Sequence, residues 1–249
     1  SDYLVESEKG QGVELELTAD EKASIADALA GLSSAQAINA ITLSYVQTEE
    51  LAPAAVLREK ARALSQNGAG IDLVDTKDAL SLEELGGVDI LGPWLVERLD
   101  TLTDEDAREF GLAVPKGPLL IGPPGCGKSA LAKAAGKARG LPVMFVNIGD
   151  LFGSGVGESE GNMRQLLRTL KAAAPIIAVF DEMEKGVSMS TGSNSGDSGT
   201  SARMMGKLLT EMQEMTEPVF FVGTLNDVEA MPPEMMRKGR WGELFLLDL

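Results

Sequence analysis

One octapeptide of the sequence, residues 122–129 (Gly-Pro-Pro-Gly-Cys-Gly-Lys-Ser), combines glycines, a lysine and a hydroxyl. Glycines at this spacing let backbone N–H groups turn inward around phosphate oxygens, Lys128 can reach the terminal phosphates, and the Ser129 hydroxyl can bind Mg²⁺. An apolar run precedes the octapeptide, and a helix-forming run, residues 130–139, follows it. A helix that begins here would add positive potential beside the phosphates. The pattern therefore predicts a P-loop that binds ATP with Mg²⁺.

A pair of carboxylates, Asp181 and Glu182, follows the apolar run of residues 176–180. An apolar run of this length predicts a buried strand, and a strand beside the P-loop would bring its carboxyl end to the phosphates. Asp181 would hold Mg²⁺ through water, and Glu182 would polarise the attacking water. By itself, a strand that ends in two acids is usually a solvated strand end. Together with the P-loop it predicts hydrolysis.

The composition narrows the class of protein. The chain has 249 residues, a formal charge of -16, one cysteine and no histidine. Such an acidic chain repels phosphate backbones, which disfavours a nucleic-acid partner. The missing histidines exclude His-based triads, His-bearing zinc sites and His-Glu-x-x-His proteases within this chain. No apolar run is long enough to span a bilayer and no secretory signal is visible, so we expect a cytoplasmic protein, or a stromal one in a plastid-bearing organism.

Hydrophobic patterning divides the chain into three segments. Residues 1–17 are acidic and predict an N-terminal arm, and residues 18–70 show helical spacing with stop and start signals, which predicts a small all-helical subdomain. In residues 71–249 short apolar runs alternate with helical segments, which predicts a parallel sheet covered by helices. The expected strands include residues 118–121, 143–146, 176–180 and 219–222. The Gly/Ser stretch of residues 188–201 predicts a loop. The fold class is therefore α/β, a P-loop NTPase preceded by an all-helical subdomain.

Residues 80–249 resemble the large subdomain of the AAA ATPases, in the AAA+ superfamily. Besides the P-loop and the Asp-Glu strand, the matching landmarks are Leu85-Gly86-Gly87-Val88-Asp89, residues 156–160 (Val-Gly-Glu-Ser-Glu), Thr224-Leu225-Asn226 and residues 237–241 (Arg-Lys-Gly-Arg-Trp). The sequences of residues 150–153, 196–200 and 237–240 are most similar to those of the AAA proteins of cyanobacterial and plastid conserved open reading frames.

The resemblance implies roles for residues that spacing alone does not assign. It implies that Leu85 and Gly86 hold the adenine edge through their backbone, and that Asn226 is a polar sensor that helps to place the lytic water. It also implies that Arg237 and Arg240 are arginine fingers that act on ATP bound by the next subunit. The nucleotide-binding set is Leu85, Gly86, Pro124, Gly125, Cys126, Gly127, Lys128, Ser129 and Ala130, the metal set is Ser129 and Asp181, and the catalytic set is Glu182, Asn226, Arg237 and Arg240.

Plainer interpretations of several of these residues stay open. Asn226 could be an ordinary turn residue, and the two arginines a solvated basic pair. Cys126 occupies a P-loop position whose side chain usually packs, although a redox role is conceivable. Met204, Met205, Met212 and Met215 recur at helical spacing, which favours an adaptable core or an interface over a peptide groove.

The chain departs from the AAA pattern in three ways. Gly155 stands where an aromatic or large apolar residue normally grips a threaded polypeptide. The sequence stops at Leu249, after the expected last core strand, so we expect the C-terminal helical lid to be absent. The helices of residues 18–66 instead resemble such a lid placed ahead of the module.

These observations favour a Mg²⁺-dependent ATPase whose sites lie between subunits of a homo-oligomeric ring, most plausibly a hexamer, that remodels a protein client. The alternative is an ATP-gated scaffold that assembles but threads no client, which Gly155 favours. A DNA-directed motor ranks below both because no basic stripe is present, and a membrane-tethered protease ranks lowest because the chain has neither a span nor histidines.

Overall fold

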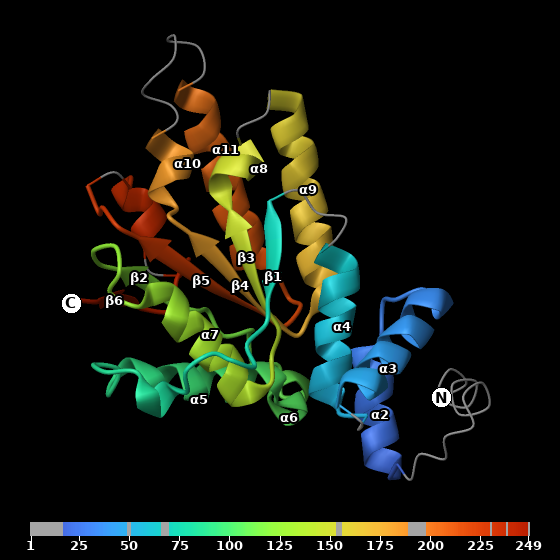
Figure 1. Ribbon diagram of the computed structural model, residues 1–249. Coiled ribbons are helices and arrows are strands. Elements are labelled where there is room, and N and C mark those ends of the chain that lie inside the picture. Colours follow the sequence, from blue (N-terminus) through green and yellow to red (C-terminus); the bar gives the residue numbers. More distant parts are fainter. Residues whose placement is uncertain are drawn as a thin grey trace.

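The computed structural model in Figure 1 describes residues 17–48, 51–65, 70–152, 156–188, 198–229, 231–237 and 239–248. Its first part is a helical subdomain of α2 (Ala19–Ala28), α3 (Ser34–Thr48) and α4 (Pro53–Ser65). Helix α2 begins at a capping box, in which the Thr18 N–H donates to Glu21 Oε2 (2.8 Å) and the Glu21 N–H donates to Thr18 Oγ1 (3.3 Å). Buried Ile25, Ile41 and Val56 join the three helices in a core of their own, as the helical spacing of this segment predicts.

The second part is built on a six-stranded sheet with the order β1-β3-β4-β5-β2-β6. The strands are β1 (Ile71–Val74), β2 (Leu119–Ile121), β3 (Val143–Asn147), β4 (Ile176–Asp181), β5 (Val219–Leu225) and β6 (Leu244–Leu246). All neighbours pair in parallel except β1, which pairs antiparallel with β3. The predicted α/β fold is confirmed. The sheet is mostly parallel, and only at one edge does a strand, β1, run antiparallel to its neighbour β3.

Helices cover both faces of this sheet, because the central strands are apolar on both faces. Alternate residues of β4 point to opposite faces: Phe180 packs with α9 and α11 residues such as Leu170 and Met205, and Val179 packs with α7 and α5 residues such as Leu131. Figure 1 shows these helix pairs on opposite sides of the sheet. The bounds are η1 (Leu82–Glu84), α5 (Leu91–Thr103), α6 (Glu105–Glu109), α7 (Lys128–Arg139), α8 (Ile148–Phe152), α9 (Val156–Ala173), α10 (Glu184–Ser188), α11 (Ser198–Glu214) and η2 (Pro233–Met236).

The four α11 methionines lie in the core. Met204, Met205, Met212 and Met215 are all buried in the cluster that fills one face of the sheet. Their spacing therefore marks the core-facing side of a helix, in agreement with the interpretation as an adaptable core.

The helical subdomain is attached to the sheet through α4 and β1. Helix α4 packs against α9 and against β1, the edge strand that follows it. In Figure 1 this places the helical subdomain beside one edge of the sheet, next to α9. The buried Lys60 of α4 donates a hydrogen bond to the Ala174 carbonyl (3.3 Å), in the turn between α9 and β4. None of the helices that the structure describes is long and apolar enough to cross a membrane.

Candidate nucleotide site

The P-loop joins the end of β2 to the start of α7. Gly122 must be glycine here, because a Cβ atom would lie 2.2 Å from the Leu247 carbonyl oxygen and 2.9 Å from the Cys126 sulfur. Gly125 and Gly127 have φ angles of 91° and 87°, in the left-handed region that other residues rarely adopt. The glycine spacing therefore serves both a close approach and a turned backbone, as the motif predicts.

Lys128, the first residue of α7, is folded back over this loop. Its Nζ donates to the carbonyls of Gly122 (2.7 Å) and Pro123 (2.9 Å), and the side chain is only 7% exposed. These two partners are neutral carbonyls, and the third is the Cys126 sulfur, a weak acceptor. A phosphate oxygen would be a stronger partner, because hydrogen bonds between two charged groups are shorter and stronger than those to neutral groups.

The acidic residues meet the P-loop at the carboxyl ends of the parallel strands. Asp181 ends β4, Glu182 follows it, and Asn226 follows β5. A cavity of about 300 Å³ brings these side chains together with the P-loop; its lining is Pro124, Gly125, Gly127, Lys128, Ser129, Ala130, Asp181, Glu182 and Asn226. Every residue of this lining belongs to the set named from the sequence, and parallel strands bring their carboxyl ends to the same edge of a sheet.

Glu182 has an unusual backbone and two side-chain partners. Its φ angle is 50°, and this left-handed conformation costs a non-glycine residue of order 1–3 kcal/mol. Asn226 Nδ2 donates to Glu182 Oε1 (3.1 Å), and the Lys185 ammonium forms an ion pair with Glu182 Oε2. This hydrogen-bonded pairing with Glu182 raises the pKa of Lys185. The Asn226 side chain is therefore in direct contact with the Glu182 carboxylate.

Two further residues organise the site and were missing from the sequence-based set. The buried Thr224 donates through Oγ1 to Asp181 Oδ1 (2.5 Å) and accepts from the Glu182 N–H (2.9 Å). Glu184 Oε1 accepts from the Asn226 N–H (3.2 Å), which fixes the start of the segment after β5. The sequence carries a weak signal for each, since Thr224 precedes Asn226 by two positions and Glu184 follows Glu182 by two positions.

The residues present fit a Mg²⁺–nucleoside triphosphate. Magnesium prefers oxygen ligands and is usually held by one or two carboxylates together with substrate phosphates. The Ser129 hydroxyl and the Asp181 carboxylate line the same cavity as Lys128 and the start of α7, whose backbone N–H groups suit phosphate. Anion-binding and cation-binding groups are therefore adjacent.

The remaining predicted residues lie outside this cavity. Leu85 and Gly86 follow η1, which packs against α7. Arg237, directly after η2, is exposed, and Arg240 is half-buried. Cys126 is a free, half-buried thiol whose sulfur lies 3.6 Å from Lys128 Nζ. Gly155 falls outside the described residues, as do most of the positions in the Gly/Ser stretch.

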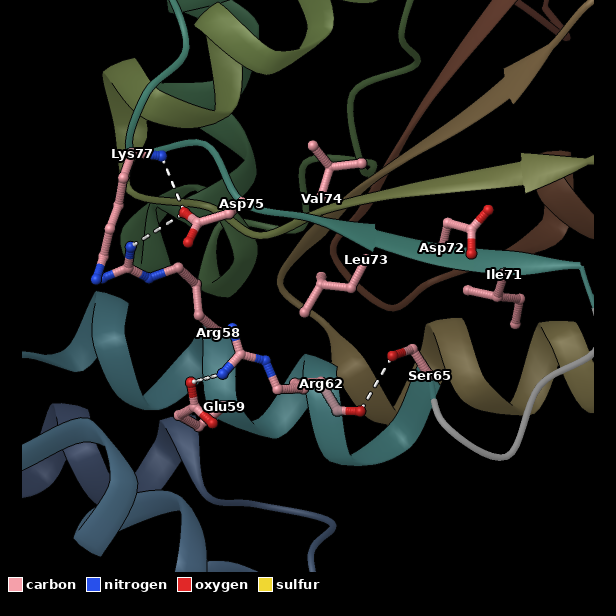
Figure 2. A pocket seen from close by; sticks show the side chains of 10 residues that line it. All are labelled: Arg58, Glu59, Arg62, Ser65, Ile71, Asp72, Leu73, Val74, Asp75 and Lys77. Atoms are coloured by element: carbon pink, nitrogen blue, oxygen red, sulfur yellow. Dashed lines mark hydrogen bonds and ion pairs between the residues drawn. The ribbon is translucent and has the colours of Figure 1, made fainter. Parts of the chain in front are cut away.

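A separate cavity of about 290 Å³ lies between α4 and β1, and Figure 2 shows ion pairs among the residues that line it. Arg62 donates to Glu59 (2.9 Å), Arg58 lies 4.0 Å from Asp75, and the Lys77 N–H donates to the same aspartate (3.0 Å). Acids and bases balance here without convergent groups for a phosphate. The P-loop cavity is therefore the better nucleotide site.

Comparison with known proteins agrees with this geometry. Residues 118–249, just over half of the chain, match the family described as "ATPase family associated with various cellular activities (AAA)". The chain belongs to this family. Residues 2–67 match a second description, "SpoVK-like AAA ATPase, second domain", so the segment that contains the helical subdomain also has an AAA relationship.

Several relatives carry the printed name "Uncharacterized AAA domain-containing protein ycf46". The protein of Trieres chinensis is 39% identical over 201 residues, covering 76% of this chain and 40% of the relative. That of Guillardia theta is 37% identical over 195 residues (78% and 37%), and that of Pyropia yezoensis is 42% identical over 167 residues (67% and 33%). The predicted resemblance is confirmed. The chain spans 33–40% of the length of these relatives.

Proposed function

We propose that the chain binds and hydrolyses ATP with Mg²⁺ at sites shared between subunits of a homo-oligomeric hexameric ring, and that ATP hydrolysis drives remodelling of a protein client. One observation carries the proposal: a single cavity joins Lys128 and Ser129 of the P-loop to Asp181, Glu182 and Asn226. Family membership supports ATP-driven activity in general. The ring and the client are our additions.

Each residue of the site has a chemical task in this proposal. The P-loop backbone and Lys128 bind and orient the β- and γ-phosphates, which positions the terminal phosphate for in-line attack. Ser129 and Asp181 would hold Mg²⁺, which when bound neutralises charge on the phosphate oxygens. Glu182 accepts a proton from, or polarises, the attacking water, and Asn226 orients that water together with Glu182.

The exposure of Arg237 supports a site completed by a neighbour. Arg237 does not line the cavity of its own chain, and the residue is exposed. A guanidinium supplied by the next subunit would stabilise charge in the transition state and make hydrolysis depend on assembly. Arg240, three residues after Arg237, would support the same contact with the neighbouring site.

Glu182→Gln separates binding from hydrolysis. The amide is nearly the same size as the carboxylate but is a poor base, so we expect ATP affinity close to wild type and a kcat lower by roughly 10²–10⁴-fold. Nucleotide binding measured with a fluorescent ATP analogue and phosphate release measured on the same preparation give both values. Equal turnover in the two proteins would remove Glu182 as the group that activates water.

Mixed assemblies test the shared site. Arg237→Ala should lower specific activity by about 10³-fold or more, and mixing it with Lys128→Ala subunits should restore part of that activity. Specific activity of the wild type should also rise with protein concentration. A mixture that stays inactive although mixed rings form, or a fully active dilute monomer, would contradict the shared site.

The second candidate function is an ATP-gated scaffold without threading, and Gly155 favours it. Glycine has no side chain with which to press on an extended peptide. If the missing side chain is what prevents threading, the aromatic side chain of Gly155→Tyr should produce peptide-stimulated ATPase activity or unfolding of a tagged substrate. Processive unfolding by the wild type that survives Phe152→Ala and Val156→Ala would count against the scaffold and require a different grip.

We further propose that the segments act as a three-part chain: an acidic arm (residues 1–17), a lid-like helical subdomain (18–70) and a nucleotide-binding subdomain (71–249). The match of residues 2–67 to an AAA description supports the middle assignment. We propose the cytoplasm as the compartment, or the plastid stroma in a plastid-bearing organism. Truncation to residues 71–249 tests the division, because a lid-like role predicts that nucleotide binding weakens.

A further inference from the structure

Thr224 lies directly behind the two site carboxylates. Strands β4 and β5 pair in a register that sets Phe180 opposite Gly223, so the next residues along, Asp181 and Thr224, lie side by side. Thr224 is fully buried, and it does not line the nucleotide cavity. Any effect of Thr224 on the reaction must therefore act through its neighbours.

Its hydroxyl forms two hydrogen bonds of opposite sense. Oγ1 donates its one proton to Asp181 Oδ1 (2.5 Å) and uses a lone pair to accept the Glu182 N–H (2.9 Å). The Thr224 carbonyl accepts the Met183 N–H (3.1 Å). One residue of β5 thus contacts three consecutive residues at the end of β4.

We propose that Thr224 is a positioning residue of the ATPase site, which orients the Asp181 carboxylate toward Mg²⁺ and holds Glu182 in its left-handed backbone conformation. The inference rests on the proposed function. A carboxylate with one oxygen fixed by a hydrogen bond has its other oxygen aimed in a set direction. The same hydroxyl satisfies the amide of a residue at φ 50°, and a residue in this conformation persists only where its surroundings hold it.

A merely structural role makes a different prediction. If Thr224 only joins β4 to β5, its loss should lower stability and leave the Mg²⁺ dependence and kcat of the folded protein unchanged. If it positions Asp181 and Glu182, its loss should change both quantities in protein that is still folded.

Thr224→Val is the direct test, because valine has the shape of threonine without the hydroxyl. We expect the Mg²⁺ concentration for half-maximal ATPase activity to rise and kcat at saturating Mg²⁺ to fall, each by roughly tenfold. ATP binding in the presence of EDTA should stay at the wild-type level, because the P-loop is untouched. Thr224→Ser, which keeps the hydroxyl, should restore both values.

Val222→Ala is the matched control. Val222 lies two residues earlier on the same face of β5 and is equally buried, but it packs in the core away from the carboxylates. It should lower the melting temperature without changing the Mg²⁺ dependence. If Thr224→Val does not fold, Thr224→Ser and Thr224→Cys form a second pair of variants of similar size. Only the serine is a strong hydrogen-bond donor, so the cysteine variant should need the higher Mg²⁺ concentration for half-maximal ATPase activity.

The outcomes separate this inference from the proposed function. A folded Thr224→Val protein with wild-type Mg²⁺ dependence and kcat overturns the positioning role alone. A wild type that assembles but never hydrolyses ATP overturns the proposed function. In that case the strengthening of ATP binding by Mg²⁺ still tests Thr224, because the inference expects Thr224→Val to reduce it and a structural role does not.

Discussion

Two buried lysines of this chain occupy contrasting surroundings. Lys128 is 7% exposed, donates to two carbonyls and lines the cavity that also holds Asp181 and Glu182. Lys60 is 2% exposed, donates to one carbonyl at the junction of α4 with the α9–β4 turn, and forms no ion pair with any carboxylate that the structure describes. Burial lowers the pKa of Lys60.

The difference shows that burial of a charge does not by itself mark a functional site. Lys128 lies where carboxylates, a hydroxyl and a helix N-terminus converge, so an incoming anion would meet several groups at once. Among the residues that the structure describes, the hydrogen-bond partner of Lys60 is a neutral carbonyl, so its charge is retained at a cost to folding. The same substitution at both positions should therefore have opposite consequences.

Lys128→Met and Lys60→Met should differ most in ATP affinity. Lys128→Met removes the cation that meets the terminal phosphates in the proposed function, and we expect affinity to fall by roughly a hundredfold or more. Lys60→Met should bind ATP like the wild type. Titration with a fluorescent ATP analogue measures both, and a similar loss in the two variants would abolish the contrast between the lysines.

Lys60→Met should stabilise the fold or leave it unchanged. Methionine can fill much of the space of the lysine stem, and it removes a buried charge that lacks an anionic partner, so we expect a gain of about 1–2 kcal/mol in the free energy of unfolding. Urea unfolding measures this, with the exposed Lys207→Met as the control for charge alone. A clear loss of stability at Lys60 would mean that its hydrogen bond to Ala174 outweighs the cost of the buried charge.

The pH dependence of stability should sharpen the same comparison. The folded pKa of Lys60 is lowered from the usual 10.5, so between these two values the unfolded chain binds more protons than the folded one. Stability of the wild type should therefore rise with pH through that window, relative to Lys60→Met. Unfolding curves of both proteins in the alkaline range give the difference, and parallel curves would show that the ammonium is not desolvated.

Lys185→Met should have the smallest effect. Lys185 is paired with Glu182, but its side chain is 60% exposed, and such surface pairs contribute roughly 0–1 kcal/mol. We expect a stability change within about 0.5 kcal/mol and a modest rise in basal ATPase activity, because Glu182 loses a competing partner. Steady-state kinetics and thermal unfolding measure both, and a collapse of activity would assign Lys185 to the site itself.

Much of the nucleotide site was predictable from local sequence. The glycine spacing of the P-loop and the apolar run before Asp181 and Glu182 depend on residues close in the chain, and the turned loop and the buried strand are found as predicted. The antiparallel β1 was not predicted as a strand, because a four-residue run, Ile-Asp-Leu-Val, has too little pattern to reveal its partner or direction. Thr224 and Glu184 were missed for a similar reason. Their hydrogen-bond partners lie far away in the sequence and come close only because β4 and β5 end at the same edge of the sheet.

The sequence by itself determined which chemical groups this protein can use, namely the glycines, lysine and hydroxyl of the P-loop and the two carboxylates after an apolar run, and which runs must be buried as strands. These properties follow from residue type and short-range periodicity, which act over a few positions of the chain. Only the tertiary structure decided that Thr224 bridges Asp181 and Glu182, that Asn226 touches Glu182, and that Lys60 is buried without an anion. Those contacts depend on strand register and helix docking, which many distant residues fix together and no local pattern specifies.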